Sequence, residues 1–482
     1  IDNRWLPVSR STRESLQQGY PTAIWRIAKG HVSKVASSDR DFLHFRVPLT
    51  GTFAVEAFAS AFNYREMRLG YGGTSAGPMY DHQTLFRGHH ARDLPGLLLS
   101  PPLDEITEPM RVRLEVSQGS VSTLINGRKV HETTASVSDP WLTLFSPWSA
   151  HGEVSNLRIL GAPEIPDSID LLADRRLLGW DEFYGTLDGD NADWEMVDAT
   201  TAEGMKEESG VVLRGKRREI VTGSHCERLL RYHRPVFEDA VLSYEFFYRD
   251  GSYAVHPAIG GKAYLLDSRG QVDVYEKTEP IATASALANV GLRNNAWNRM
   301  EIHMRDRKIE LSLNGSVVHD GVLEEESSRE FGLFYYCDQS EALVRDFRWS
   351  GSWPKTPDAI KSQPLADATL EEMLGGAALE QSFRHDFANG LPLETFAISG
   401  EGWKENLKQV DRGIQMVRPG GNYVEYLITP SLQIAGDFDV IAEFEGFDAT
   451  IDAGGDANIK LMLGFAENSA DYRLYRKFSR YA

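Results

Sequence analysis

The sequence predicts an all-β protein in which antiparallel β-sandwiches follow one another along the chain. Two observations predict this fold. Short runs of alternating apolar and polar residues are separated by turn residues, and a set of landmarks recurs at nearly constant spacing. Helical periodicity is nearly absent. The length of 482 residues agrees with about three domains, at roughly 150 residues for each.

The first landmark is a short aromatic or aliphatic run that ends at a proline, at Pro48, Pro235 and Pro430. These prolines are 187 and 195 residues apart. A polar turn and an alternating strand with one glutamate follow each of them. The glutamates are Glu56, Glu245 and Glu443. Because each copy carries one, we interpret the three glutamates as occupying the same structural position.

The second landmark is an Asn-Gly dipeptide between two alternating runs, at Asn126-Gly127 and, 188 residues later, at Asn314-Gly315. This pattern is the strongest short-range signal for a β-hairpin. The third landmark is a closing strand, at residues 154–163 in one copy and 344–354 in the next. The shared order and spacing predict that these copies have the same fold.

The landmarks predict where each copy begins and ends. We expect sandwich one at residues 19–161, a linker with one helical turn at 162–179, sandwich two at 180–351, a linker at 352–381 in which Asp367 caps a short helix, and a partial sandwich at 382–482. The third copy has neither the Asn-Gly hairpin nor the closing strand in this sequence, so we expect it to be incomplete.

Sandwich two shows its strands most clearly, as about ten short runs. They are residues 211–217, 228–234, 240–248, 262–268, 271–277, 299–306, 308–315, 316–321, 330–336 and 344–350. Within the sixth run, Met300, Ile302 and Met304 are predicted to face the core, while Glu301 and His303 face water. This alternation is typical of an antiparallel sheet with one buried and one wet face.

Sandwich two contains a series of motifs in a fixed order. They are LRGKRR (213–218), SHCERLLRYHRP (224–235), YEFFY (244–248), HPAIG (256–260), WN (297–298), LNG (313–315), FGLFYYCDQ (331–339) and VRDFRWSGSWP (344–354). In these motifs it resembles the planctomycete proteins that carry the domain of unknown function 1583. More broadly, it is similar to the concanavalin-like (laminin-G-like) jelly rolls, including the branch of keto-disaccharide hydrolases. The resemblance implies a jelly-roll sandwich and leaves the activity open.

Composition excludes several classes of protein. Apolar residues make up 41% of the chain, which excludes a disordered polymer. The 51 Lys and Arg against 70 Asp and Glu give a net charge of −19, so we expect no nucleic-acid partner. No apolar run reaches the roughly 18 residues of a membrane-spanning helix. Two cysteines exclude a disulfide-stapled scaffold.

Sandwich two also concentrates polar and aromatic residues that its core pattern does not need. The candidates for ligand binding are Arg228, His233, Arg234, Tyr248, Asp338, Gln339, Arg345 and Trp353. The candidates for acid–base catalysis are Glu245, His225 and His256. The first and last strands of a jelly roll commonly lie side by side, so we expect many of these groups to converge.

Three functions remain open for this set of residues. A glycan or glycoconjugate would be held by arginine, carboxylate and aromatic side chains. A glycoside-cleaving enzyme would need Glu245 beside a histidine in a closed pocket. A structural spacer would use Arg228, Arg234 and Arg345 only in ion pairs, with no cleft. The signatures E-x-D-x-x-E, G-x-S-x-G and H-E-x-x-H are absent from the sequence.

No cofactor is required by these patterns, but metal sites are conceivable. A Ca²⁺ ion would suit the acidic loop with Asp188, Asp190 and Asp193, and a second such loop holds Asp452 and Asp456. A transition metal would suit the loop with Asp81, His82, His89 and His90. Solvated acidic turns and a histidine-rich surface loop are the alternatives.

Cysteine and tryptophan positions give further expectations. Cys226 and Cys337 either form a disulfide, which would indicate an oxidising compartment, or remain as two thiols. Trp297 and Trp349 are predicted to lie in the core, and Trp353 to stack at the surface. Together the residues favour glycan binding in the periplasm or at a cell surface, with further domains of a longer chain as possible partners. Cleavage and a spacer role remain the alternatives.

Overall fold

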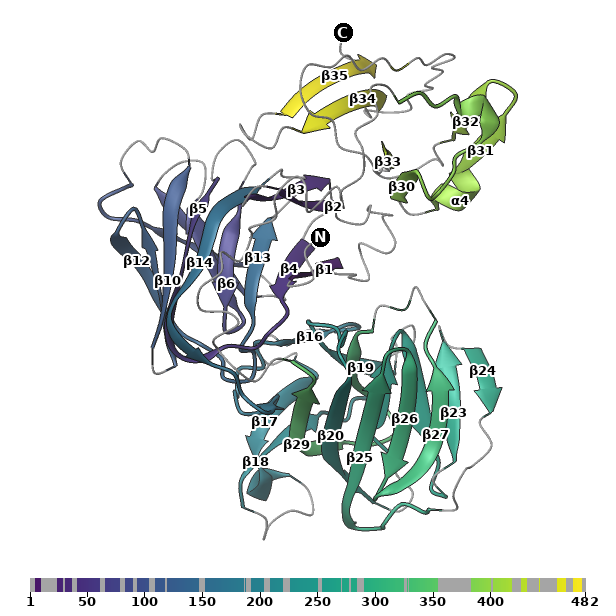
Figure 1. Ribbon diagram of the computed structural model, residues 1–482. Helices are drawn as coiled ribbons and strands as arrows, with labels where there is room; N and C mark the ends of the chain where they lie inside the picture. The colour runs from purple at the N-terminus through teal and green to yellow at the C-terminus, as the bar shows by residue number, and fades with distance from the viewer. Residues whose placement is uncertain are drawn as a thin grey trace.

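The fold was determined as a computed structural model of the 482-residue chain. It describes residues 5–9, 24–28, 31–36, 41–60, 66–78, 83–89, 93–103, 109–117, 119–146, 152–185, 187, 192–202, 209–219, 226–249, 254–269, 271–276, 279–283, 290–324, 327, 329–353, 383–399, 402–417, 426–430, 442, 457–464 and 471–478. Figure 1 shows two sandwiches followed by short hairpins. The predicted antiparallel sandwich fold is therefore confirmed.

Sandwich one consists of two seven-stranded antiparallel sheets. The strand order of its first sheet is β1(Trp5–Ser9), β4(Asp41–Phe45), β13(Leu142–Ser146), β6(Arg68–Tyr71), β7(Thr74–Pro78), β8(Thr84–His89) and β9(Asp93–Leu98). The order of its second sheet is β12(Arg128–Thr134), β11(Ser120–Ile125), β10(Met110–Ser117), β5(Thr50–Ala59), β14(Glu153–Glu164), β3(His31–Ala36) and β2(Ile24–Ala28).

Sandwich two has the same order of strands. Its first sheet runs β16(Trp180–Glu182), β19(Glu227–Tyr232), β28(Phe331–Tyr336), β21(His256–Ile259), β22(Lys262–Leu266), β23(Val272–Glu276) and β24(Glu279–Thr283). Its second sheet runs β17(Trp194–Asp198), β18(Val211–Gly215), β29(Ala342–Gly351), β20(Ala240–Tyr248), β25(Ala296–Arg305), β26(Lys308–Leu313) and β27(Ser316–Val322). Each of these strands thus has a counterpart in sandwich one.

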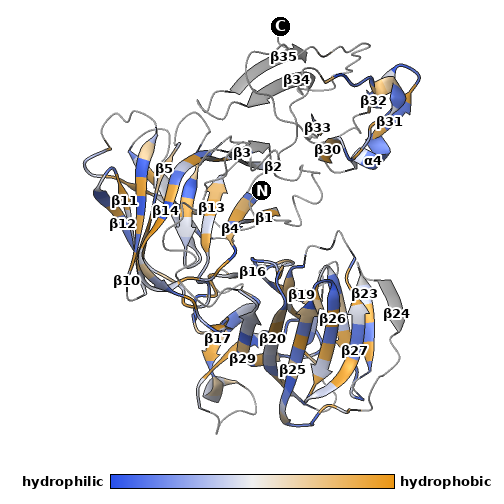
Figure 2. Ribbon diagram, viewed as in Figure 1, coloured by the Kyte–Doolittle hydropathy of each residue, from blue (hydrophilic) through white to orange (hydrophobic). Residues whose placement is uncertain are grey.

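Alternation along the strands produces the cores. Met300, Ile302 and Met304 are buried, as predicted, and Figure 2 shows hydrophilic and hydrophobic residues alternating along β25 and β26. Both Asn-Gly dipeptides form the expected hairpin turns, with φ of 49° and 84° at Asn126 and Gly127 and 50° and 84° at Asn314 and Gly315.

Two boundaries differ from the sequence prediction. β1 lies before residue 19 and pairs with β4, so sandwich one includes an earlier strand. The segment expected to be a linker with a helical turn instead contains β15(Ile169–Asp170), which pairs with β29 of sandwich two. β14 also extends to Glu164, past the expected end of sandwich one. The short helix expected after Asp367 lies outside the described residues.

The third region is described as three separate two-stranded sheets. They are β30(Phe396–Ser399) with β33(Leu427–Pro430), β31(Leu407–Val410) with β32(Gly413–Met416), and β34(Ala457–Gly464) with β35(Asp471–Phe478). One turn of 3₁₀-helix, η3(Phe387–Asn389), and one short helix, α4(Trp403–Asn406), accompany them. Nowhere in the described residues is a helix long and apolar enough to cross a bilayer.

The two sandwiches share an interface made of buried aromatic and polar side chains. Arg234 of sandwich two places its guanidinium carbon 3.8 Å from the ring centre of Trp141 of sandwich one and 4.9 Å from that of Trp349. Trp141 Nε1 donates to the Tyr232 hydroxyl at 3.2 Å, and that hydroxyl donates to Asp139 Oδ1 at 3.0 Å. These contacts join the two sandwiches through one polar network.

Candidate functional site

The hairpins give a common register for comparing the two sandwiches. The backbone N–H of Arg111 donates to Asn126 Oδ1 at 3.0 Å, and that of Arg299 donates to Asn314 Oδ1 at the same distance. Arg111 and Arg299 are therefore equivalent positions. Arg111 pairs with Phe58 on β5, whereas Arg299 pairs with Glu245 on β20.

The interpretation that Glu56 and Glu245 occupy the same position is therefore wrong. Glu245 is equivalent to Phe58, and Glu56 is equivalent to Ser243. Ser243 lies two residues before Glu245 on β20, on the same face of the sheet. The prolines themselves are in register, since Pro48 and Pro235 are 187 residues apart, as Phe58 and Glu245 are. Glu56 follows its proline by 8 residues and Glu245 by 10, so the two glutamates were two residues out of register. Glu443 lies outside the described residues. Glu245 is thus a feature of sandwich two and not of the common fold.

The partner of Glu245 is also particular to sandwich two. Arg345 on β29 pairs in register with Glu245, whereas sandwich one has Ser155 opposite Phe58. Arg345 Nε donates to Glu245 Oε2 at 2.8 Å. The same guanidinium lies 4.0 Å from the ring centre of Trp297 on β25. An acid, a base and an indole are therefore gathered on the outward face of this sheet.

A β-bulge beside this pair is common to both sandwiches. The register between β20 and β29 shifts at the bulge, where Asp346 has φ of 52°. In sandwich one the register of β5 and β14 shifts at the equivalent place, and Asn156 has φ of 51°. Asn and Asp tolerate this left-handed conformation better than other non-glycine residues. The bulge presents the exposed Asp346 next to Arg345.

A cavity of about 410 Å³ lies over this face. Its floor includes Trp297, Arg345 and Asp346 from the sheet. Its other lining residues come from the segment around β15 and from the two sides of the excursion between β17 and β18; they are Asp170, Leu172, Ala173, Arg175, Ala199, Ser209, Gly210, Val211 and Val212. The size falls within the roughly 300–1,000 Å³ that is usual for small-ligand sites.

A small apolar cluster supports the cavity. Ala199, Ala202, Val212 and Leu343 are buried together, with Val197, Phe247 and Trp297 packed against them. The 3₁₀ turn η2(Ala199–Thr201) thereby stays against the outward face of the sheet. Trp297 was predicted to be in the main core and is instead half-buried at this cavity. The even-numbered residues of β25 face the core, so the odd-numbered Trp297 is expected to face outward. This pattern in the sequence was enough to place it.

Several predicted ligand residues belong to the interface between the sandwiches. Arg234 is fully buried and bonds Glu238 at 3.1 Å. His233 Nε2 lies 2.7 Å from Asp139 Oδ1 of sandwich one. The prediction that Trp353 stacks at the surface is wrong, because its ring is buried beside Trp141 and its Nε1 donates to the Pro166 carbonyl at 2.8 Å. These residues hold the sandwiches together.

Arg228 also serves a buried ion pair. Its Nε lies 2.9 Å from Asp193 Oδ2, and Arg218 Nε lies 3.1 Å from the other oxygen of that carboxylate. Beside them, Glu182 is buried with its Oε2 atom unpaired among the described residues. Burial, with the nearby charge of Asp193, raises the pKa of Glu182 to about 8.

The predicted catalytic residues do not assemble. His256 is buried on β21, in the sheet opposite Glu245, and its Nδ1 accepts the Leu266 N–H at 3.0 Å. Burial lowers the pKa of His256 to about 3, which keeps it neutral. His225 lies outside the described residues. Tyr248, predicted to bind ligand, instead faces the core, as do its even-numbered neighbours Tyr244 and Phe246.

The remaining candidates lie at the end of β28. Gln339 Nε2 donates to Asp338 Oδ2 at 3.0 Å, and Gln339 is exposed. Neither residue lines the cavity described above. Cys226 and Cys337 are both free thiols, so the disulfide alternative is not what the structure contains. They remain close, because the Cys337 N–H donates to the Cys226 carbonyl at 2.8 Å.

The candidate metal sites find little support in the part of the chain that is described. Asp193 is occupied by two arginines, which would repel a cation. Among the described residues no group of three or more His, Cys, Asp or Glu side chains is arranged to hold a metal ion. Asp188, Asp190, Asp81, His82, His90, Asp452 and Asp456 lie outside the described residues.

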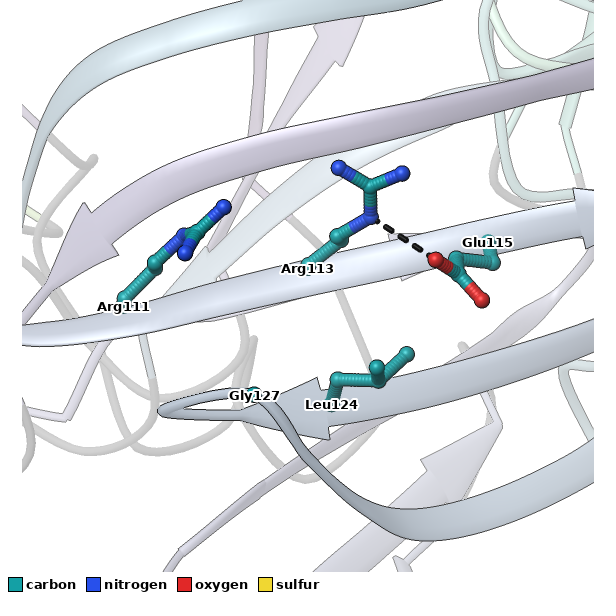
Figure 3. A pocket seen from close by; sticks show the side chains of 5 residues that line it. All are labelled: Arg111, Arg113, Glu115, Leu124 and Gly127. Carbon is teal, nitrogen blue, oxygen red and sulfur yellow. Dashed lines mark hydrogen bonds and ion pairs between the residues drawn. The ribbon is translucent and has the colours of Figure 1, made fainter.

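A second, smaller cavity of about 210 Å³ lies on sandwich one, lined by Arg111, Arg113, Glu115, Leu124 and Gly127. Figure 3 shows Arg113 and Glu115 joined on β10, with Arg111 beside them. The sequence prediction placed no site here, because it used the polar residues of sandwich two. The two arginines at alternate positions of one strand were the available signal.

No curated protein matches this chain. Among solved structures, it is similar to the carbohydrate binding module CBM66 from Bacillus subtilis (14% identity, 36% of this chain and 96% of that one, TM-score 0.24). It is also similar to the cellulose induced protein Cip1 (14%, 39% and 99%, TM-score 0.27). A third is the alginate lyase from Corynebacterium sp. (13%, 30% and 77%, TM-score 0.24).

Family models match most of the chain. The domain of unknown function DUF1583_N matches residues 221–356, and the C domain of the protein of unknown function DUF1583 matches residues 360–481. A further model, the protein of unknown function DUF1581, matches residues 113–194. The motifs of sandwich two that resembled this group lie largely inside the first of these matches. The chain belongs to the DUF1583 family.

Proposed function

We propose that this protein binds carbohydrate in the cavity over the outward face of sandwich two. The observation that carries the proposal is the presence of Trp297 and Arg345 in that cavity's floor, with Arg345 held by Glu245 beside it. An aromatic ring beside charged hydrogen-bonding groups suits a sugar, which has an apolar C–H face and a rim of hydroxyls. Leu172 and Val211 add apolar surface, and Asp170 and Asp346 add acceptors.

Common architecture does not account for this grouping. Sandwich one has the same strands and the same bulge, but it has Phe58 and Ser155 where sandwich two has Glu245 and Arg345. Pro109 occupies the position of Trp297, two residues before the equivalent arginine. The cavity also favours binding over a spacer role. Arg228 and Arg234 make buried ion pairs and do not line the cavity, whereas Arg345 both makes an ion pair and lines it.

Binding is favoured over cleavage by the positions of the titratable groups. A glycosidase of the usual kind needs two carboxyl groups on either side of the bond that breaks, one of them as a proton donor. Glu245 is bonded to Arg345, and the carboxyl group with the raised pKa, Glu182, does not line the cavity. His256 is buried in the opposite sheet. Location outside the cytoplasm is part of the same proposal.

The test is a glycan array with the full chain, followed by calorimetric titration of the best oligosaccharide. The Trp297→Ala variant is expected to bind roughly 5- to 150-fold more weakly, since stacking of a ring on an aromatic side chain contributes about 1–3 kcal/mol. Phe58→Ala is the matched control, because Phe58 is also a half-buried aromatic residue on the equivalent outward face. Equal affinity in the two variants, or no glycan bound by the parent, contradicts the proposal.

A further inference from the structure

We propose, building on the carbohydrate binding above, that the arginines around Glu56 on sandwich one bind the acidic groups, carboxylate or sulfate, of a polysaccharide. This surface is separate from the cavity of sandwich two. It lies on the outward face of the sheet formed by β5, β10, β11 and β14, over the second cavity of about 210 Å³.

Glu56 holds two guanidinium groups side by side. Arg111 Nη2 donates to Glu56 Oε2 at 2.6 Å, and Arg113 Nη1 donates to the same oxygen at 3.3 Å. Both arginines point to one side of β10 because they are two residues apart on a strand. Side chains of like charge would otherwise separate, so Glu56 fixes their positions.

Each arginine retains donors that Glu56 does not use. Arg111 is 49% exposed at its side chain, and its Nε and Nη1 atoms have no partner among the described residues. Arg113 gives its Nε to Glu115 at 2.9 Å and its Nη1 to Glu56, which leaves Nη2. Planar guanidinium groups bind carboxylate and sulfate oxygens in a two-point manner.

A third arginine makes the face positive overall. Arg158 on β14 pairs in register with Glu56 from the other side and is exposed. Three arginines, Arg111, Arg113 and Arg158, thus share this face with two glutamates, Glu56 and Glu115. The face therefore has a net charge of about +1, although the whole chain has a net charge of −19. The hydrogen bonds from the arginines lower the pKa of Glu56, so it stays ionised and keeps this arrangement at neutral pH.

The surroundings suit a polymer with widely spaced charges. No atom lies within 4 Å of the position that a Cβ atom would take at Gly127 in the hairpin. The cavity is therefore open on the side next to Arg111. No aromatic ring lines it, which disfavours stacking with nucleic-acid bases. The strongly acidic chain also repels a dense polyanion such as DNA, whereas a polysaccharide with one acidic group per sugar is repelled less.

The common fold does not require these charges. At the equivalent positions of sandwich two, Ser243 stands in place of Glu56 and Glu301 in place of Arg113. Arg299 matches at the position of Arg111 and Arg348 at that of Arg158, but the glutamate between them is missing, and Arg299 instead bonds Glu301 at 3.0 Å. Arg299 is 52% exposed at its side chain, nearly the same as Arg111. It therefore provides a matched control with the same charge, exposure and hairpin.

The experiment measures binding of polygalacturonate, κ-carrageenan, neutral dextran and duplex DNA to the full chain and to the Arg111→Ala and Arg299→Ala variants. The parent is expected to bind polygalacturonate or κ-carrageenan and to bind DNA at least tenfold more weakly. Arg111→Ala is expected to reduce binding of the acidic polysaccharide about tenfold, and Arg299→Ala less than twofold. Thermal melting of both variants checks that they are folded.

Equal losses in the two variants, no binding of either acidic polysaccharide, or DNA binding as tight as theirs would overturn the inference. The polymer that binds distinguishes carboxylate from sulfate as the recognised group. The two proposals fail in different experiments. The cavity of sandwich two is tested with neutral oligosaccharides and Trp297→Ala, whereas this surface is tested with acidic polymers and Arg111→Ala.

Discussion

Arg345 Nε and Glu245 Oε2 lie 2.8 Å apart on the outward face of sandwich two. Their side chains are 31% and 24% exposed, and ion pairs with this much solvent contribute at most about 1 kcal/mol to stability. Folding therefore does not explain why sandwich two has this pair and sandwich one does not. The proposed ligand site accounts for the pair, because Arg345 lies in the cavity floor beside Trp297.

Removal of Arg234 is expected to destabilise the two joined sandwiches strongly. Arg234→Ala leaves the buried carboxylate of Glu238 without its partner and empties the space between Trp141 and Trp349. Breaking a buried ion pair costs about 3–5 kcal/mol. Urea unfolding should show this loss, against less than about 0.5 kcal/mol for the exposed Arg299→Ala control. A loss below about 1 kcal/mol for Arg234→Ala would mean that the interface does not depend on it.

Glu182 is expected to make stability fall as pH rises. Its pKa is about 8 in the folded chain and 4.5 ordinarily, so the folded state binds a proton more tightly. The stability is present below pH 4.5 and is lost as pH rises through 8, by at most about 5 kcal/mol. Asp193 and Tyr335 face Glu182, and Arg228 partly offsets the effect.

The measurement compares the free energy of unfolding of the parent and of Glu182→Gln from pH 5 to pH 9. The difference between them should move in favour of the glutamine variant as pH rises, because glutamine cannot ionise. Asp181→Asn is the control, because Asp181 is the neighbouring carboxylate on β16 and is paired with Arg231 at 3.1 Å. A difference that stays constant across this range would show that Glu182 is not protonated in the folded chain.

Both cysteines are expected to titrate as thiols. Cys226 is partly exposed and Cys337 is buried, so a thiol reagent should modify Cys226 first in the native protein and both after denaturation. Burial raises the pKa of each thiol, which slows the reaction further. Mass spectrometry of the Cys226→Ser variant assigns the two rates. Finding no reactive thiol after denaturation without reductant would show a disulfide instead.

Chelation is expected to leave the fold unchanged. Since Arg218 and Arg228 neutralise Asp193, a Ca²⁺ ion has no place beside this carboxylate. The melting temperature in EDTA should therefore equal that in excess Ca²⁺. A clear rise in melting temperature with Ca²⁺, abolished by Asp188→Asn with Asp190→Asn, would instead assign an ion to the acidic loop.

Local patterns in the sequence predicted the strands well, because alternation and turn chemistry act between near neighbours. The hairpins at Asn126 and Asn314 and the inward set with Met300 followed from them. The same alternation would have placed Trp297 outward and Tyr248 inward, had it been extended along their strands. The sequence alone therefore held enough information for these two residues.

Other residues depend on contacts between distant segments, which no local pattern reveals. Trp353 follows the end of β29 and is buried beside Trp349. Trp141 of sandwich one and the Pro166 carbonyl also contact it, and both are distant from it in the chain. Arg234 was predicted to bind ligand, but in the structure Glu238 and the two tryptophans surround it and leave no room for a ligand contact. Asp170 and Arg175 join the cavity because β15 pairs with β29, where a linker was expected.

The account depends most on where a glycan binds, and hydrogen exchange measures this directly. Mass spectrometry of the full chain, with and without the best oligosaccharide from the array, reports the backbone amides that the ligand protects. We predict slower exchange in residues 170–175 and 209–212, which form the walls of the cavity, and no change in residues 226–234 at the interface between the sandwiches. Protection confined to residues outside the cavity walls would contradict the proposed site.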